Sequence, residues 1–262
     1  MQRTVSAQLA LSVDDDATLA FIVAVAGRPT AERLDLRFEG AALQPREVTD
    51  AAGTRIHVVD VGAGAVTLDY AATVDGRADA ASVTELEQLE YLRPSRYCEA
   101  DRLAHTAYAE FSGLAGADLL AAVSSWVGTR LSYVPGSSLP TDGAVQTLLA
   151  GQGVCRDYAH LVIGLLRSLD VPARLAAVYA PGLDPMDFHA VAEAYVEGAW
   201  HVVDATTLAP RSTLVRIATG RDAADTAFLS SYGGNVVLES ILVGAVADVL
   251  PDDDVMRLER LG

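Results

Sequence analysis

The sequence predicts an α+β fold, in which an N-terminal antiparallel β-sandwich is followed by a domain that mixes helices with an antiparallel hairpin. Three observations predict this fold class. Short alternating strands fill the first eighty or so residues, an amphipathic helix begins at Cys155, and a two-stranded hairpin covers residues 187–206. The charged segment SVTELEQLEYLRPSRYCEADRL separates the two parts. We therefore predict domains over residues 1–88 and 89–262.

The N-terminal part is predicted as strands because apolar and polar residues alternate in it. The segments RLDLRFEG and VTLDYAATV show this period of two most clearly, and the turn signals DDD, AGRP, GAGA and DGR separate the strands. Such a run of short strands is typical of a small β-sandwich. We find no catalytic cluster in it, and we interpret His57 as a structural histidine.

Composition limits the classes of partner. A chain of 262 residues with 51% hydrophobic content can bury one large core or two moderate ones. The net charge of −16 argues against nucleic acid and acidic membrane surfaces as partners. No apolar run approaches the roughly 18 residues that span a bilayer, and the acidic triplet at residues 14–16 interrupts any secretory segment. We expect a cytoplasmic protein whose two cysteines are reduced.

The stretch GVCRDYAHL places Cys155 at the start of the predicted helix. Apolar residues recur at spacings of three and four from Cys155 to Leu169, and Pro172 prevents the helix from continuing. The first turn of a helix favours negative charge, and therefore the reactive thiolate. The alternative is a buried, inert cysteine. His160 cannot serve as its base, because five residues place it about 140° away around the helix axis.

A better base lies in the hairpin DFHAVAEAYVEGAWHVVDAT. A two-residue turn at Glu197-Gly198 pairs the strands so that His189 and Asp204 share one face as diagonal neighbours. The same register sends His201 to the opposite face. A three-residue turn would shift the register and separate the pair. A cysteine, a histidine and a carboxylate are the groups that a thiol acyl-transfer enzyme needs.

Several segments resemble the bacterial transglutaminase-like superfamily, whose members are often described as putative cysteine proteases with a papain-like catalytic core. The matching segments are GVCRDYAHL with PAR after its helix, DFHAVAEAYV and WHVVDAT, while YLRPSRYCEADRL and LVRIATGRDAAD resemble a subgroup with an N-terminal β domain. The resemblance implies that Cys155 is the nucleophile, His189 the base and then the acid, and Asp204 the orienting carboxylate. It also implies that the cysteine helix packs on an antiparallel sheet.

The remaining candidates are interpreted as structural. This interpretation covers Cys98, and it assigns Trp126, Tyr133 and Trp200 to core packing rather than to a substrate cleft. Arg221 and Asp222 belong to the segment that resembles the subgroup and receive no assigned role, although a structural pair is favoured. The Cys155 backbone N–H is the natural first donor of an oxyanion hole. The sequence identifies no second donor.

The predicted function is thiol-dependent attack on a peptide or protein amide through a thioester, with hydrolysis favoured and no cofactor. Transfer to an amine is the alternative outcome. All 19 basic residues are arginines, so the protein cannot cross-link itself through lysine amines. A non-catalytic interaction module on the same fold is a second alternative. A metal site is a third, which the lack of any CxxC or HxxxH pattern disfavours. The oligomeric state is not predicted.

Overall fold

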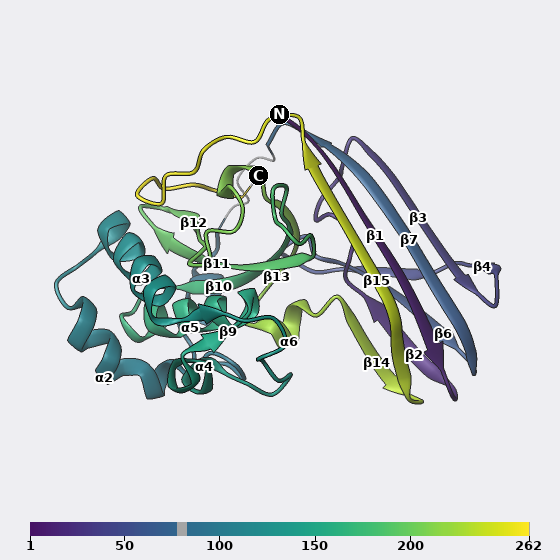
Figure 1. Ribbon diagram of the computed structural model, residues 1–262, viewed down its shortest axis with the longest axis horizontal. Helices are drawn as coiled ribbons and strands as arrows, with labels where there is room; N and C mark the ends of the chain where they lie inside the picture. The colour runs from purple at the N-terminus through teal and green to yellow at the C-terminus, as the bar shows by residue number, and fades with distance from the viewer. Residues whose placement is uncertain (78–82, 262) are drawn as a thin grey trace.

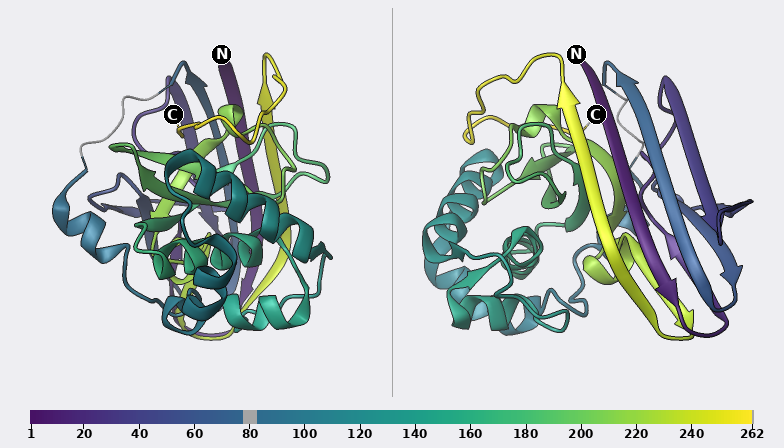
Figure 2. Two further views of the ribbon diagram at one scale, coloured as in Figure 1. Left: turned by 90° about the vertical axis from the view of Figure 1, so that its left-hand side faces the viewer. Right: turned by 45° about the vertical axis from the view of Figure 1, so that its right-hand side comes forward.

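The computed structural model describes residues 1–77 and 83–261. Long strands lie on one side of the molecule and helices on the other, with a four-stranded sheet between them (Figure 1). The two further views in Figure 2 show the same separation of helices from long strands. The α+β fold class is therefore confirmed.

The sandwich consists of two antiparallel sheets with the strand orders β15-β1-β7-β3-β4 and β14-β2-β6-β5. Every second side chain of β1 is buried, because successive residues of a strand face opposite sides of a sheet. The strands are β1 (Gln2–Val13), β2 (Ala17–Phe21), β3 (Ala31–Phe38), β4 (Ala41–Leu43), β5 (Arg46–Thr49), β6 (Arg55–Val61), β7 (Gly64–Asp75), β14 (Leu229–Gly233) and β15 (Val236–Ala247).

The predicted domain over residues 89–262 is wrong at its C-terminal end. Strand β14 pairs with β2, and β15 pairs with β1 along almost its whole length. The chain therefore returns to the sandwich after the helical part. The physical reason is that β1 and β2 would otherwise be unpaired edges with free backbone groups.

The second part of the chain surrounds a central helix. Its elements are α1 (Glu85–Glu90), α2 (Ala100–Phe111), α3 (Gly116–Arg130), β8 (Ser132–Tyr133), α4 (Ala144–Ala150), β9 (Gln152–Gly153), α5 (Cys155–Ser168), β10 (Ala173–Tyr179), β11 (Phe188–Val196), β12 (Ala199–Val203), the 3-10 turn η1 (Arg211–Thr213), β13 (Val215–Gly220) and α6 (Ala223–Thr226). The sheet has the order β12-β11-β10-β13. Helix α5 is buried on nearly every side and packs on β10 and β11, with α2, α3 and α4 around it. A cysteine helix on an antiparallel sheet is thus confirmed.

No single helix in residues 1–77 and 83–261 combines the length and apolar composition of a membrane span, and α2 and α3 meet that test only as a pair bent by 107°.

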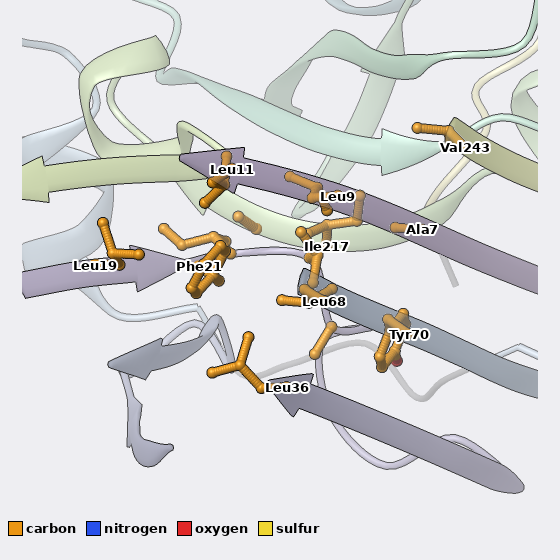
Figure 3. Packing of buried hydrophobic residues seen from close by; sticks show 14 of the residues in the cluster. Ala7, Leu9, Leu11, Leu19, Phe21, Leu36, Leu68, Tyr70, Ile217 and Val243 are labelled. Atoms are coloured by element: carbon orange, nitrogen blue, oxygen red, sulfur yellow. The ribbon is translucent and has the colours of Figure 1, made fainter. Parts of the chain in front are cut away.

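The hydrophobic core of the sandwich extends onto the central sheet. Ile217 of β13 lies among the sandwich side chains Leu9 and Leu68 (Figure 3). The Tyr179 hydroxyl donates to the Val23 carbonyl at 2.7 Å, which adds a buried polar link between β10 and the sandwich. The sandwich is therefore packed against the central sheet as a continuous body.

Candidate active site

Cys155 is the first residue of α5, and the backbone before it requires glycine. Gly151 ends α4 in the left-handed region with φ of +66°, which glycine adopts without a steric penalty. A Cβ atom on Gly153 would lie 2.7 Å from the Asp157 Cβ. The Asp157 carboxylate accepts a hydrogen bond from the Val154 N–H at 2.8 Å and so caps the helix. These contacts fix the Cys155 backbone at the positive end of the helix dipole.

The arginine beside the cysteine fastens a loop to the same helix end. Arg156 donates from Nη2 to the Ser138 Oγ at 2.6 Å and to the Leu139 carbonyl at 3.1 Å. Ser138 in turn donates to Asp157 Oδ1 at 2.9 Å. The loop after β8 is therefore held against the helix start, and the Cys155 side chain stays half-buried rather than sealed in the core.

The hairpin of β11 and β12 has the predicted register. Glu197 and Gly198 both have positive φ, +52° and +79°, as a two-residue type I′ turn requires. Val196 accordingly pairs with Ala199. The pairing continues up the strands and brings the two predicted site residues of the hairpin to the same face.

His189 and Asp204 form a buried pair. His189 Nε2 lies 2.8 Å from Asp204 Oδ2, and both side chains are almost completely shielded from solvent. The other carboxylate oxygen, Oδ1, accepts hydrogen bonds from the Thr206 N–H at 2.9 Å and the Thr206 hydroxyl at 2.7 Å. Asp204 is thus held in one orientation, and it holds the imidazole in turn.

Electrostatics favour the charged forms of this pair. Burial lowers the pKa of His189, but the Asp204 carboxylate and the neighbouring Cys155 thiol outweigh burial and raise it to about 10. Burial raises the pKa of Asp204, but the charge of His189 and the hydrogen bonds from His189 and Thr206 bring it below its ordinary value. The second ring nitrogen of His189, Nδ1, is buried and makes no hydrogen bond to the described residues. It is the nitrogen left to exchange a proton with the thiol.

Comparisons with known proteins identify the family and the fold of the chain. The family model of the transglutaminase-like superfamily matches residues 107–205, which include the three predicted site residues. A putative cysteine protease from Cytophaga hutchinsonii has a crystal structure that superposes with a TM-score of 0.86 at 32% sequence identity, over 97% of this chain and 92% of that one. The chain belongs to the transglutaminase-like superfamily. An uncharacterized protein of Mycobacterium leprae (strain TN) is 29% identical over 122 residues, and this match covers 43% of the present chain and 44% of that protein.

His160 is the other histidine within the superfamily motif GVCRDYAHL, and it serves the fold. Its Nε2 accepts a hydrogen bond from the Ala223 N–H at 3.1 Å, and its ring stacks on Tyr97 at 5.2 Å. Asp222 accepts from the Tyr97 N–H at 2.9 Å. Burial lowers the pKa of His160 to about 3, so the ring stays neutral. This cluster confirms the structural interpretation of Asp222 and explains why it lies close to the cysteine helix.

Two further motif residues are structural in the same region. Arg221 forms an exposed ion pair with Asp225, with 2.9 Å between Nε and Oδ2. The Cys98 thiol is fully buried, and burial raises its pKa above the ordinary range. Neither Cys98 nor Cys155 is in a disulfide. Cys98 is therefore the inert cysteine of the two.

Core packing was predicted for three aromatic residues, and the structure shows it for the two tryptophans but not for Tyr133. Trp126 packs edge-on against Phe111 with 5.7 Å between the ring centroids, and Trp200 packs on Tyr91 at 5.5 Å, so both belong to the core. Core packing is wrong for Tyr133, whose exposed fraction is 41%. Strand β8 contains only two residues, and within residues 1–77 and 83–261 it pairs only with β9.

The remaining histidines lie away from the pair. His201 is buried on β12 opposite Ala194, on the face that His189 does not use, and His57 lies 3.1 Å from the Glu47 carboxylate within the sandwich. In the part of the chain that the structure describes, no group of three or more His, Cys, Asp or Glu side chains could hold a metal ion.

Sequence reasoning did not identify Asp157 and Thr206 as supporting residues. For each of them the sequence contains a local pattern that indicates the supporting role. An aspartate in the first turn of a helix is a typical capping residue, and a threonine two residues after an aspartate is placed to donate to its carboxylate. Asp157 holds the backbone just before Cys155, and Thr206 holds the Asp204 carboxylate.

Proposed function

We propose that the protein is a thiol-dependent acyl-transfer enzyme in which Cys155, His189 and Asp204 act as a catalytic triad on a peptide or protein amide. The observation that carries this proposal is the orientation of His189. Its Nε2 is fixed on Asp204 at 2.8 Å, its Nδ1 has no other hydrogen-bond partner among the described residues, and the Cys155 thiol lies near enough to raise the pKa of the ring. The position of Cys155 at the start of α5 adds the stabilisation of a thiolate by helix N–H groups.

The raised pKa of His189 supports an ion pair in the resting enzyme, with the proton of the thiol on Nδ1. The Cys155 thiolate attacks the carbonyl carbon, an S–C bond forms, and the C=O π electrons move onto oxygen. When the tetrahedral intermediate collapses, the C–N bond breaks and His189 gives its proton to the leaving amine. Water then attacks the thioester carbon and gives a proton to His189. The C–S bond breaks, which releases the carboxylic acid and restores the pair of Cys155 thiolate and His189 imidazolium.

We favour water over an amine as the acceptor. The Cytophaga hutchinsonii protein, which is 32% identical over nearly the whole chain, is described as a putative cysteine protease, and this description supports hydrolysis of a peptide bond. Transfer of the acyl group to an amine is the second candidate, since both reactions begin with the same thioester.

Acylation of the protein by p-nitrophenyl acetate tests the proposal. We expect a burst of p-nitrophenolate and an acetyl group on the Cys155 peptide by mass spectrometry. The burst should be slowed by about 10²-fold or more in His189→Ala, and it should be absent in Cys155→Ser. The buried Cys98 is an internal control that should stay unmodified.

Acetylation that spares Cys155, or that proceeds equally fast in His189→Ala, would contradict the triad. Addition of glycinamide then separates the two acceptors. Hydrolysis predicts that acetate remains the main product, whereas transamidation predicts that N-acetylglycinamide accumulates.

A further inference from the structure

Tyr133 is held beside the candidate nucleophile by a short parallel ladder. Strand β8 pairs with β9 so that Tyr133 lies opposite Gly153, two residues before Cys155. The Val134 N–H donates to the Gly153 carbonyl at 3.0 Å, which secures this register. The Tyr133 ring also contacts the Tyr158 ring of α5, with 6.0 Å between centroids. The backbone and the ring of Tyr133 are therefore both tied to the start of the cysteine helix.

The Tyr133 hydroxyl lies close to both the thiol and the backbone N–H of Cys155. Burial and, after it, the charge of the Cys155 thiolate together raise the pKa of Tyr133 to about 12, although a hydrogen bond from the Cys155 N–H opposes the rise. The phenol is therefore protonated at neutral pH and keeps a hydrogen to donate. The Asp187 carboxylate, just before β11, also acts on this phenol, so Tyr133 lies between the helix start and the strand that carries His189.

A neighbouring tyrosine shows the contrast with a purely structural role. The Tyr158 hydroxyl is buried and donates to the Leu131 carbonyl at 2.8 Å, which uses its hydrogen within the fold. The Tyr133 hydroxyl instead interacts with the thiol and the backbone N–H of Cys155. Its ring is partly exposed, which leaves room for a small displacement when a substrate enters.

We propose that the Tyr133 hydroxyl is the second donor of the oxyanion hole and completes it together with the Cys155 N–H. This inference rests on the proposed function. In the resting enzyme the hydroxyl accepts the hydrogen bond of the Cys155 N–H. When a substrate binds, its carbonyl oxygen takes that N–H, and the displaced hydroxyl lies beside the same oxygen. It then donates to the negative charge that develops as the Cys155 Sγ–C bond forms.

Two reactions of Cys155 that differ in one respect test this role. Alkylation by iodoacetamide displaces iodide from carbon and forms no oxyanion, whereas acylation by p-nitrophenyl acetate passes through a tetrahedral oxyanion. In Tyr133→Phe we expect acylation to fall about 10²- to 10³-fold while alkylation stays within about twofold of the parent, since only the oxyanion loses a donor. A misplaced nucleophile would slow both reactions.

Tyr158→Phe is the matched control, because it removes a neighbouring hydroxyl whose hydrogen bond lies within the fold. It should lower the melting temperature and leave the ratio of the two rates unchanged. Acylation that is unchanged or faster in Tyr133→Phe, or both rates reduced equally, would overturn the assignment. A parent protein in which Cys155 is not acylated at all, or in which His189→Ala changes nothing, would instead overturn the proposed function, and the Tyr133 role with it.

Discussion

At the scale of single residues, His189 has a different task for each ring nitrogen. Asp204 fixes Nε2 and supplies the negative charge that stabilises an imidazolium in a buried place. Nδ1 is left for proton exchange with Cys155. Thr206 limits the freedom of the carboxylate by filling the sites on its other oxygen. The charge of Asp204, rather than its hydrogen bond alone, is what keeps His189 protonated against the effect of burial.

Asp204→Asn tests that claim, because the amide keeps the shape and an acceptor oxygen but loses the charge. The pKa of His189 should fall from about 10 towards or below its ordinary value of 6.5, since only Cys155 then opposes the effect of burial. At neutral pH the ring is then neutral. Titration of the His189 ring protons by NMR measures the shift, and acylation of Cys155 should slow by about 10²-fold or more. An unchanged titration would show that Asp204 does not control the imidazole.

At the scale of elements, a buried ion cluster joins three strands of the central sheet. Glu193 of β11 is paired with Arg174 of β10 at 2.9 Å and with Arg216 of β13 at 2.7 Å. Burial raises the pKa of Glu193, but the two guanidinium groups outweigh it and lower the pKa to about 2. Glu193 shares the sheet face of His189, four residues away along the same strand. The cluster therefore stabilises the strand that carries the candidate base.

Glu193→Gln leaves the Arg216 guanidinium without its carboxylate, and Arg174 then keeps only its ion pair with Glu87. We expect the free energy of unfolding, measured with urea at neutral pH, to fall by about 3–5 kcal/mol. Since the folded pKa lies below the ordinary 4.5, the stability from Glu193 is present above about pH 4.5 and is lost as the pH falls through about 2. The difference between parent and variant should shrink over that range.

Asp35→Asn is the control for this prediction, because Asp35 forms an ion pair with Arg37 at 2.9 Å on the surface of the sandwich. Its effect on the free energy of unfolding should stay below about 1 kcal/mol. Equal losses in the free energy of unfolding in the two variants would contradict the idea that burial makes the Glu193 ion pairs more stabilising than a surface pair.

At the scale of the whole molecule, the sandwich and the central sheet share buried side chains and paired strands. Ile217 of the central sheet is buried in the sandwich core (Figure 3), and β15 returns to pair with β1. Both tryptophans, Trp126 and Trp200, lie outside the sandwich, on α3 and β12. Tryptophan fluorescence therefore reports on one part, while far-ultraviolet circular dichroism reports on both.

Ile217→Ala should lower the free energy of unfolding by about 2–5 kcal/mol, and Ile217→Val by about 0.5–1.5 kcal/mol. Because the core is shared, the fluorescence and circular dichroism transitions in urea should coincide in the parent and move together in both variants. Separate transitions, or a shift in circular dichroism alone, would mean that the two parts unfold independently.

Local features explain what the sequence could predict. The Glu197-Gly198 turn sets the hairpin register over a few residues, so the pairing of His189 with Asp204 was predictable, as was the helix that begins at Cys155. The rest depends on contacts between distant segments. Tyr133 meets the start of α5 only through the β8–β9 ladder. Strands β14 and β15 join a sandwich that was assigned to residues 1–88, and no turn or periodicity near them indicates that pairing.

The most direct test of the central claim is the pH dependence of iodoacetamide alkylation at Cys155, followed by peptide mass spectrometry, in the parent and in His189→Ala. Because His189 stays protonated at neutral pH, its positive charge should favour the reactive thiolate, and Cys155 should be alkylated faster in the parent than in His189→Ala at and below neutral pH. His189→Ala should lose this low-pH reactivity. Identical profiles for the two proteins, or a Cys155 that does not react, would contradict the poised Cys155–His189 pair and favour a non-catalytic interaction module on the same fold.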